Sequence, residues 1–152
     1  RFACVRAAGS LGASAALWDQ RAFKQTVLRG YAPWLALARP VVNGFARLLG
    51  PPPLPPVGTT LAQAYVSHLA VAPTNPAALL PLLGKIGATA AGLGIELLTL
   101  GFGANDPRLA LVRSRFRCRQ YRSRIYLVRW PDRGASPGAL DGRPLGLEVA
   151  LL

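Results

Sequence analysis

The chain has 152 residues, of which 51% are hydrophobic, and a formal net charge of +12 at pH 7. This length and apolar content exclude a disordered chain and predict one domain, residues 1–152, with a buried core. A single histidine and two distant cysteines exclude a zinc site built from these residue types. The sequence also contains no Walker, Rossmann or Gly-x-Ser-x-Gly fingerprint.

The first elements of the chain form a predicted β-hairpin. Two short apolar runs, Phe2–Arg6 and Leu11–Trp18, are separated by a connection that contains Gly9. Strands joined by a short glycine-containing loop are typical of hairpins. Cys4 and Cys118 are interpreted as small buried hydrophobic residues.

Residues 19–50 are predicted to form an α-helical insertion between strands. Apolar residues at helical spacing follow Asp19, which suits an N-cap. Two further helical pieces, Pro33–Ala38 and Pro40–Leu49, each open on a proline, which fits the first turn of a helix. The proline-rich stretch 51–58 predicts an extended connector.

The central stretch of the chain predicts a parallel strand–helix–strand unit. Leu61–Val71 suits a buried strand, and Asn75 followed by Pro76 suits a helix start in which the asparagine caps free N–H groups. Ile95–Phe102 is the second predicted strand. Between the strands, apolar residues recur at helical spacing: Leu79, Leu82, Leu83, Ile86, Ala90 and Leu93. A helix of this length joins two parallel strands of one sheet.

The last part of the chain predicts a short helix and two strands. Asn105 or Asp106 suits a cap for the helix, whose inner face includes Val112 and Phe116. The predicted strands are Arg119–Trp130 and Leu147–Leu152, joined by a polar loop, Asp132–Pro144.

A membrane span is an alternative to a buried core for the central stretch. The 22 residues between Lys85 and Arg108 contain only two charged side chains, and a stretch of this length can cross a bilayer. Glu96 would lie near the middle of such a span, at a cost of roughly 2.5–3.5 kcal/mol on insertion scales. We therefore expect no membrane partner and a cytoplasmic protein.

The order of these elements, with the segment YVSHLAVAP at residues 65–73, resembles the GNAT superfamily of N-acetyltransferases over most of the chain. The resemblance implies an α/β (α+β) fold with a mixed, mostly antiparallel twisted sheet, one parallel strand–helix–strand unit and acetyl-CoA as cofactor. The family's first strand and two helices have no counterpart here. We therefore expect the carboxy-terminal part of a longer bacterial protein, packed against an N-terminal domain or a partner chain.

The resemblance also implies which residues hold the cofactor. The backbone of Leu69, Ala70 and Val71 would align the pantetheine arm, while Asn75, Ala77 and Ala78 would receive the pyrophosphate, with Asn105 also at the cofactor. The family's pyrophosphate turn carries Gln or Arg, two residues, Gly, one residue, then Gly or Ala. Here the turn is degenerate and reads Ala-Pro-Thr-Asn-Pro-Ala-Ala over residues 72–78.

The expected reaction is transfer of an acyl group from coenzyme A to an amine by direct attack in a ternary complex. His68, the single histidine, would remove the amine proton, since histidine titrates near neutral pH; the alternative is a hydrogen-bonded core histidine. Tyr121 would replace the family's tyrosine acid. Trp18 and Asp19 would bind the amine, whose identity the sequence does not give, and Asp19 is equally suited to a structural cap.

A second hypothesis is a catalytically inactive module. Residues 113–124 carry six arginines interleaved with Phe116 and Tyr121, and we name this segment the arginine stripe. Such a stripe can bind nucleic acid, the phosphates of coenzyme A or an acidic neighbouring domain, or it can be a solvated face. Nucleic acid is the less favoured partner, because no nucleic-acid-binding fold signature accompanies the charge.

Overall fold

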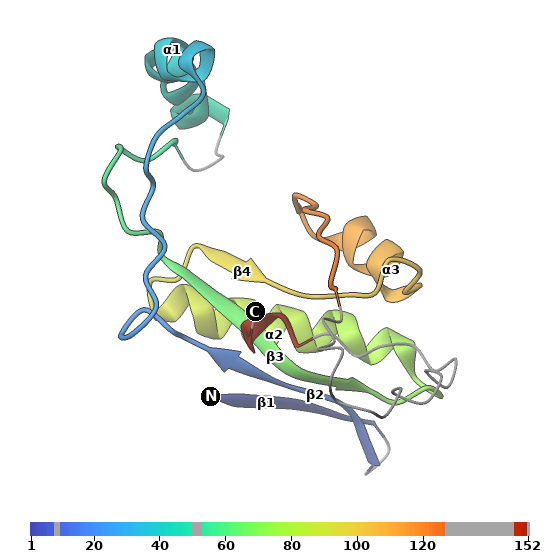
Figure 1. The fold of residues 1–152 in the computed structure, drawn as a ribbon. Helices are drawn as coiled ribbons and strands as arrows, with labels where there is room; N and C mark the ends of the chain where they lie inside the picture. Colours follow the sequence, from blue (N-terminus) through green and yellow to red (C-terminus); the bar gives the residue numbers. More distant parts are fainter. Residues whose placement is uncertain (8–9, 50–52, 127–147, 152) are drawn as a thin grey trace, which may run out of the picture.

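The computed structural model describes residues 1–7, 10–49, 53–126 and 148–151 and shows an α+β fold (Figure 1). In this part of the chain, four strands form one mixed sheet in the order β1-β2-β3-β4. Their bounds are β1 Phe2–Ala7, β2 Ser10–Trp18, β3 Gln63–Val71 and β4 Leu97–Thr99. The pairs β1–β2 and β2–β3 are antiparallel, and β3–β4 is parallel. The predicted hairpin and the predicted parallel unit are both confirmed.

One face of the sheet is covered by helix α2 (Leu79–Gly92), which follows a short 3₁₀ turn, η1 (Pro76–Ala78). The buried face of α2 consists of Leu79, Leu82, Leu83, Ile86 and Ala90, as the spacing predicts. These side chains belong to a core in which the strands contribute small residues, the fully buried Ala15 and Ala64, beside the larger Leu17 and Val66. Small residues on the strands leave the volume that the leucines of the helix fill.

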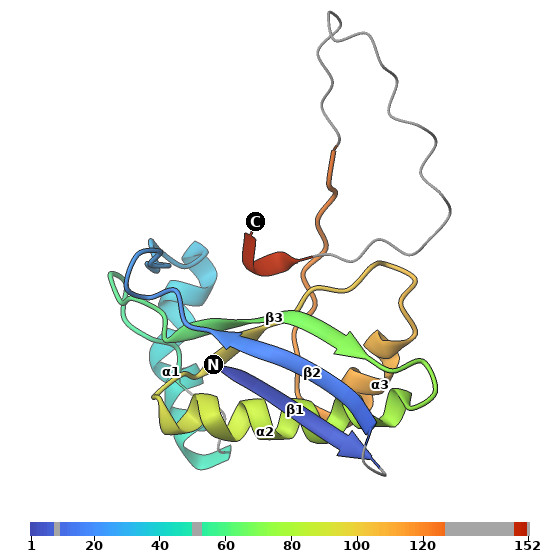
Figure 2. The same cartoon turned by 90° about the horizontal axis from the view of Figure 1, so that it is seen from below.

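The opposite face of β3 is partly covered by the end of the chain (Figure 2). Residues Val149–Leu151 form a 3₁₀ turn, η2, whose Ala150 is buried. The Nε2 of Gln20 donates a hydrogen bond to the carbonyl of Ala150 at 2.7 Å. A final strand over 147–152 was predicted, and this is wrong for the described residues 148–151.

Helix α3 (Arg108–Arg115) contacts α2 through an inner face that buries Val112. Phe116, at its end, packs against the same core, as predicted. The strand predicted from Arg119 is wrong for residues 119–126, which have no regular secondary structure. Residues 127–130 and the predicted loop 132–144 lie outside the described residues.

Helix α1 (Pro33–Leu49) lies on an arm, described over residues 22–49 and 53–61, that extends away from the sheet (Figure 1). It is one helix rather than two pieces, with Pro40 inside it. The helix predicted directly after Asp19 is wrong. There the chain pairs with residues 59–61 instead: Leu28 N–H donates to Thr59 at 3.0 Å, and Leu61 N–H donates to Thr26 at 2.8 Å.

The central apolar run divides into α2, β4 and the connecting loops, as expected from its glycines. Within the described ranges, no helix combines the length and the apolar character that crossing a membrane requires.

Candidate functional site

A β-bulge interrupts β3 at the single histidine. On one side of the interruption Ser14 pairs with Ala70, and on the other Ala16 pairs with Ser67. A single residue of β2 therefore faces two residues of β3, His68 and Leu69. His68 has a φ of 53° and is the only non-glycine residue with positive φ in the described ranges. Bulges of this kind re-aim side chains and are common beside functional sites.

The bulge changes which residues of β3 face the core. Strict alternation predicts that Ala64, Val66 and His68 share a face. Ala64 and Val66 are indeed buried under α2, but His68 is exposed. Leu69 and Val71 pack against the core in its place. The predicted alternation is thus wrong from residue 68 onward, and the alternative of a core histidine is wrong as well.

Three groups surround His68. Its backbone N–H donates to Oε2 of Glu148 at 2.7 Å, and its Nδ1 lies 3.1 Å from Oγ of Ser67. Its ring centroid is 6.1 Å from that of Phe2. Sequence reasoning missed Glu148, because no local pattern signals a contact across 80 residues of chain.

Substitutions at His68 should follow the stability order of a left-handed position. We expect His68→Val to be less stable than His68→Gly by about 1–2 kcal/mol, because a β-branched residue at positive φ is strained whereas glycine is not. At a regular strand position valine would be the more stable of the two. Urea denaturation of both variants measures the difference. A higher free energy of unfolding for His68→Val than for His68→Gly would contradict the bulge.

Beyond the bulge, one edge of β3 has no strand beside it in the described part of the chain. Pairing with β4 covers only residues 63–65, ending at Tyr65 opposite Thr99. Ala72 N–H donates to the carbonyl of Gly12 on β2 at 2.8 Å. Because backbone groups alternate along a strand, those of Leu69 and Val71 point away from β2, toward this open edge.

The same end of β3 leads into the start of α2. Asn75 precedes η1 and makes no side-chain capping bond, so its predicted capping role is wrong; its carbonyl accepts the N–H of Ala78 at 3.1 Å. A Cβ on Gly12 would lie 3.3 Å from the Cβ of Ala78, so glycine lets β2 approach this turn closely. A shallow hollow of about 200 Å³ lies here, lined by Leu11, Gly12, Ala13, Ser14, Ala70, Val71 and Ala72.

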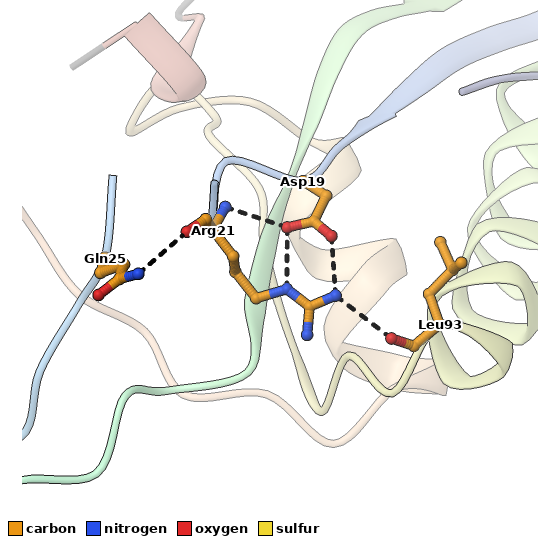
Figure 3. Close-up of polar contacts among 4 residues, drawn as sticks. All are labelled: Asp19, Arg21, Gln25 and Leu93. Atoms are coloured by element: carbon orange, nitrogen blue, oxygen red, sulfur yellow. Dashed lines mark hydrogen bonds and ion pairs between the residues drawn. The ribbon is translucent and has the colours of Figure 1, made fainter. Parts of the chain in front are cut away.

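The structure places Asp19 away from this end of the sheet. Asp19 forms an ion pair with Arg21 at 2.7 Å, and the same guanidinium donates to the carbonyl of Leu93 at 3.2 Å (Figure 3). Leu93 follows the last residue of α2, so Asp19 lies at the far end of that helix from Asn75. Hydrogen bonds from the Arg21 side chain lower the pKa of Asp19. Asp19 is thus a structural partner of Arg21 and not a helix cap.

The remaining candidates are not brought together with His68. Trp18 is paired with Tyr65 across β2 and β3, on the side of the bulge away from Ala70. Asn105 is exposed in the loop before α3, and Tyr121 is 90% exposed. Cys4 and Cys118 are also exposed, so their interpretation as buried residues is wrong.

Asp106 stabilises the start of α3. It accepts the backbone N–H of Arg108 at 2.9 Å and pairs with its guanidinium at 2.6 Å. The hydrogen bonds from the Arg108 side chain lower the pKa of Asp106 below its ordinary value of 3.8. The ionised carboxylate therefore adds stability above pH 3.8, which is lost as the pH falls through the lower folded-state pKa.

We expect Asp106→Asn to lower the free energy of unfolding by about 0.5–1 kcal/mol at pH 7, because the pair is partly exposed. The difference from the unsubstituted chain should shrink as the pH falls below about 4. Denaturant titrations at several pH values measure it, and a pH-independent difference would contradict the assignment.

All six arginines of the arginine stripe are exposed. The ion pairs found in the described residues, Asp19–Arg21 and Asp106–Arg108, involve none of them.

The described part of the chain also holds no group of three side chains able to bind a metal ion. Comparison of the chain with protein-family models, curated proteins and solved structures gives no match.

Proposed function

We propose that the chain is a degenerate GNAT-like domain that transfers an acyl group from acyl-CoA to an amine. One observation carries the proposal: β3 and β4 are parallel and pair over only three residues, so β3 continues without β4 to its carboxyl end, which leads into η1 and α2. In α/β units, ligands bind beyond the carboxyl ends of the strands, near a helix N-terminus.

The residues present fit an extended ligand that carries amide groups. Leu69 and Val71 present backbone donors and acceptors on an edge that no described strand occupies, so an amide-containing arm can pair with it as a further strand would. At the positive end of α2, Pro76 has no N–H, and the N–H groups of Asn75 and Ala78 donate to backbone carbonyls. The N–H of Ala77 is therefore the backbone donor of this turn that would receive the pyrophosphate. When bound, acetyl-CoA supplies the activated acyl group as a thioester.

His68 is the proposed general base. Its side chain is exposed, and Ser67 Oγ lies 3.1 Å from its Nδ1. The hydroxyl would orient the ring and leave Nε2 to take the proton of the attacking amine. Tyr121, which is 90% exposed in a segment without regular secondary structure, would be the acid that protonates the leaving thiolate. The amine, a cytoplasmic location and an N-terminal or partner domain stay predictions.

Calorimetry with acetyl-CoA tests the proposal. We expect binding with a Kd on the order of micromolar, the usual range for enzyme substrates, abolished by excess coenzyme A. Hydrolysis or transfer assays with small amines then test His68→Ala, which should lose most of the rate and keep the affinity. An absence of binding by a chain that circular dichroism shows to be folded would contradict the proposal.

The second candidate is a non-catalytic module that binds polyanions through the arginine stripe. The observation that favours it is the exposure of all six arginines without an acidic partner in the described residues. Fluorescence anisotropy with a labelled oligonucleotide tests it. Phosphate-driven binding should weaken by about 10³-fold or more between 50 and 200 mM salt if six contacts form. Salt-independent or undetectable binding would exclude this candidate.

A further inference from the structure

Helix α1 turns its apolar side outward. Its outward face consists of Trp34, Leu37, Val41, Val42, Phe45, Leu48 and Leu49, which are 38–85% exposed. At 100° per residue these seven positions cover a continuous arc of about 140° of the helix surface. A soluble domain normally buries such a face, so an apolar surface of this width marks an interaction site.

The polar side of α1 is hydrogen-bonded to the connector that follows the helix. Asn43 forms two hydrogen bonds with the backbone of Leu54, donating from Nδ2 at 3.0 Å and accepting at Oδ1 at 2.7 Å. Nε of Arg39 donates to the same Leu54 carbonyl at 3.2 Å, and the hydroxyl of Tyr31 donates to Pro55 at 2.6 Å. The connector after α1 therefore holds the helix in the orientation that leaves its apolar side exposed.

Charge narrows the choice of partner. Between Asp19 and Glu96 the sequence has no acidic residue, while residues 22–57 contain four basic ones: Lys24, Arg29, Arg39 and Arg47. Two copies of this arm would bring like charges together, which disfavours a second copy as the partner. A partner surface that carries negative charge complements the positive charge of the arm.

The width of the face excludes a single partner helix. A helix that packs on one other helix uses a narrow seam, whereas a wide apolar arc suits a broad apolar surface such as the apolar–polar boundary of a bilayer. Helix α1 lies on an arm away from the sheet, where such a boundary can reach it (Figure 1). Tryptophan and phenylalanine on the apolar side with arginine on the polar side are typical of helices that lie in a membrane interface.

We infer that α1 is an interfacial anchor that lays its outward face on an anionic lipid bilayer. This association with the surface is distinct from spanning, which needs a longer apolar helix than any in the described residues. The proposed acyl transfer does not depend on it.

Co-sedimentation of the full chain with phospholipid vesicles tests the inference. We expect binding to phosphatidylcholine vesicles that contain about 30% phosphatidylserine, at least about tenfold tighter than to phosphatidylcholine alone. Leu37→Glu and Phe45→Glu should each weaken binding by at least about tenfold, because each places a carboxylate on the inserted face. Circular dichroism should show both variants folded, since the two side chains are 85% and 59% exposed.

Leu151→Glu is the matched control, because Leu151 is 70% exposed but lies on η2, away from α1 (Figure 1). It should bind vesicles as the unsubstituted chain does. Three results would overturn the inference: no vesicle binding, vesicle binding that both α1 variants retain, or a dimer in solution that Leu37→Glu dissociates. The second result would assign binding to the arginine stripe, and the third would assign the face to another copy of the chain.

Discussion

Leu82→Ala is expected to lower the free energy of unfolding by about 2–5 kcal/mol, toward the upper end of that range. Leu82 is fully buried on α2, in a core that includes the fully buried alanines Ala15 and Ala64. The cost of a cavity depends on how far its walls can collapse, and short alanine side chains cannot reach into it.

Urea or guanidinium denaturation measures this loss. Leu37→Ala is the control, because Leu37 is 85% exposed on α1 and its truncation should change stability by no more than about 0.5 kcal/mol. Equal losses for the two variants would mean that α2 does not supply the core.

Val71→Pro is expected to weaken acetyl-CoA binding by at least about tenfold, or about 1.4 kcal/mol, if the proposed site is correct. Proline removes the backbone N–H at a position where that group points to the open edge of β3 and not to β2. The ladder with β2 should survive, so the variant should fold. The loss of affinity would then show that the ligand accepts a hydrogen bond from the backbone N–H of Val71.

Val71→Ala provides the comparison, since it keeps the N–H and shortens the side chain. Calorimetry should give an affinity within about threefold of the unsubstituted chain, because no backbone bond to the ligand is lost. If Val71→Pro binds as well as Val71→Ala, the pantetheine arm does not pair with this edge and the proposed binding mode is wrong.

Local sequence patterns predict helix α2 and the hairpin of β1 and β2, because both elements depend on residues close together in the chain. The spacing from Leu79 to Ala90 predicts both the helix and its buried face, and the apolar runs around Gly9 predict the hairpin. The prediction failed where distant contacts decide the structure. Residues after Asp19 have helical spacing, yet they pair with Thr59 and Leu61, which lie more than thirty residues away.

The candidate site could be predicted only in part. His68 was identified as the chemically distinctive residue of β3, but its surroundings were not. A bulge adds one residue to the strand without any clear sequence signal, and that residue reverses the inside and outside positions that follow. Likewise, the sequence around Asp19 suits a helix cap, and only the structure shows that its carboxylate accepts hydrogen bonds from the Arg21 side chain.

The sheet ends at β1, whose outer side has no strand beside it in the described part of the chain. An open border of this kind invites other polypeptides to add to it and so to form aggregates. The register between β1 and β2 shifts between Val5 and Arg6, where Gly12 is an extra residue of β2, and Arg6 is exposed. A bulge increases the local twist, and a charged side chain at an edge disfavours further pairing. The stretch of β1 best suited to accept another strand is therefore Phe2–Val5, which is shorter than the usual strand of about five or six residues.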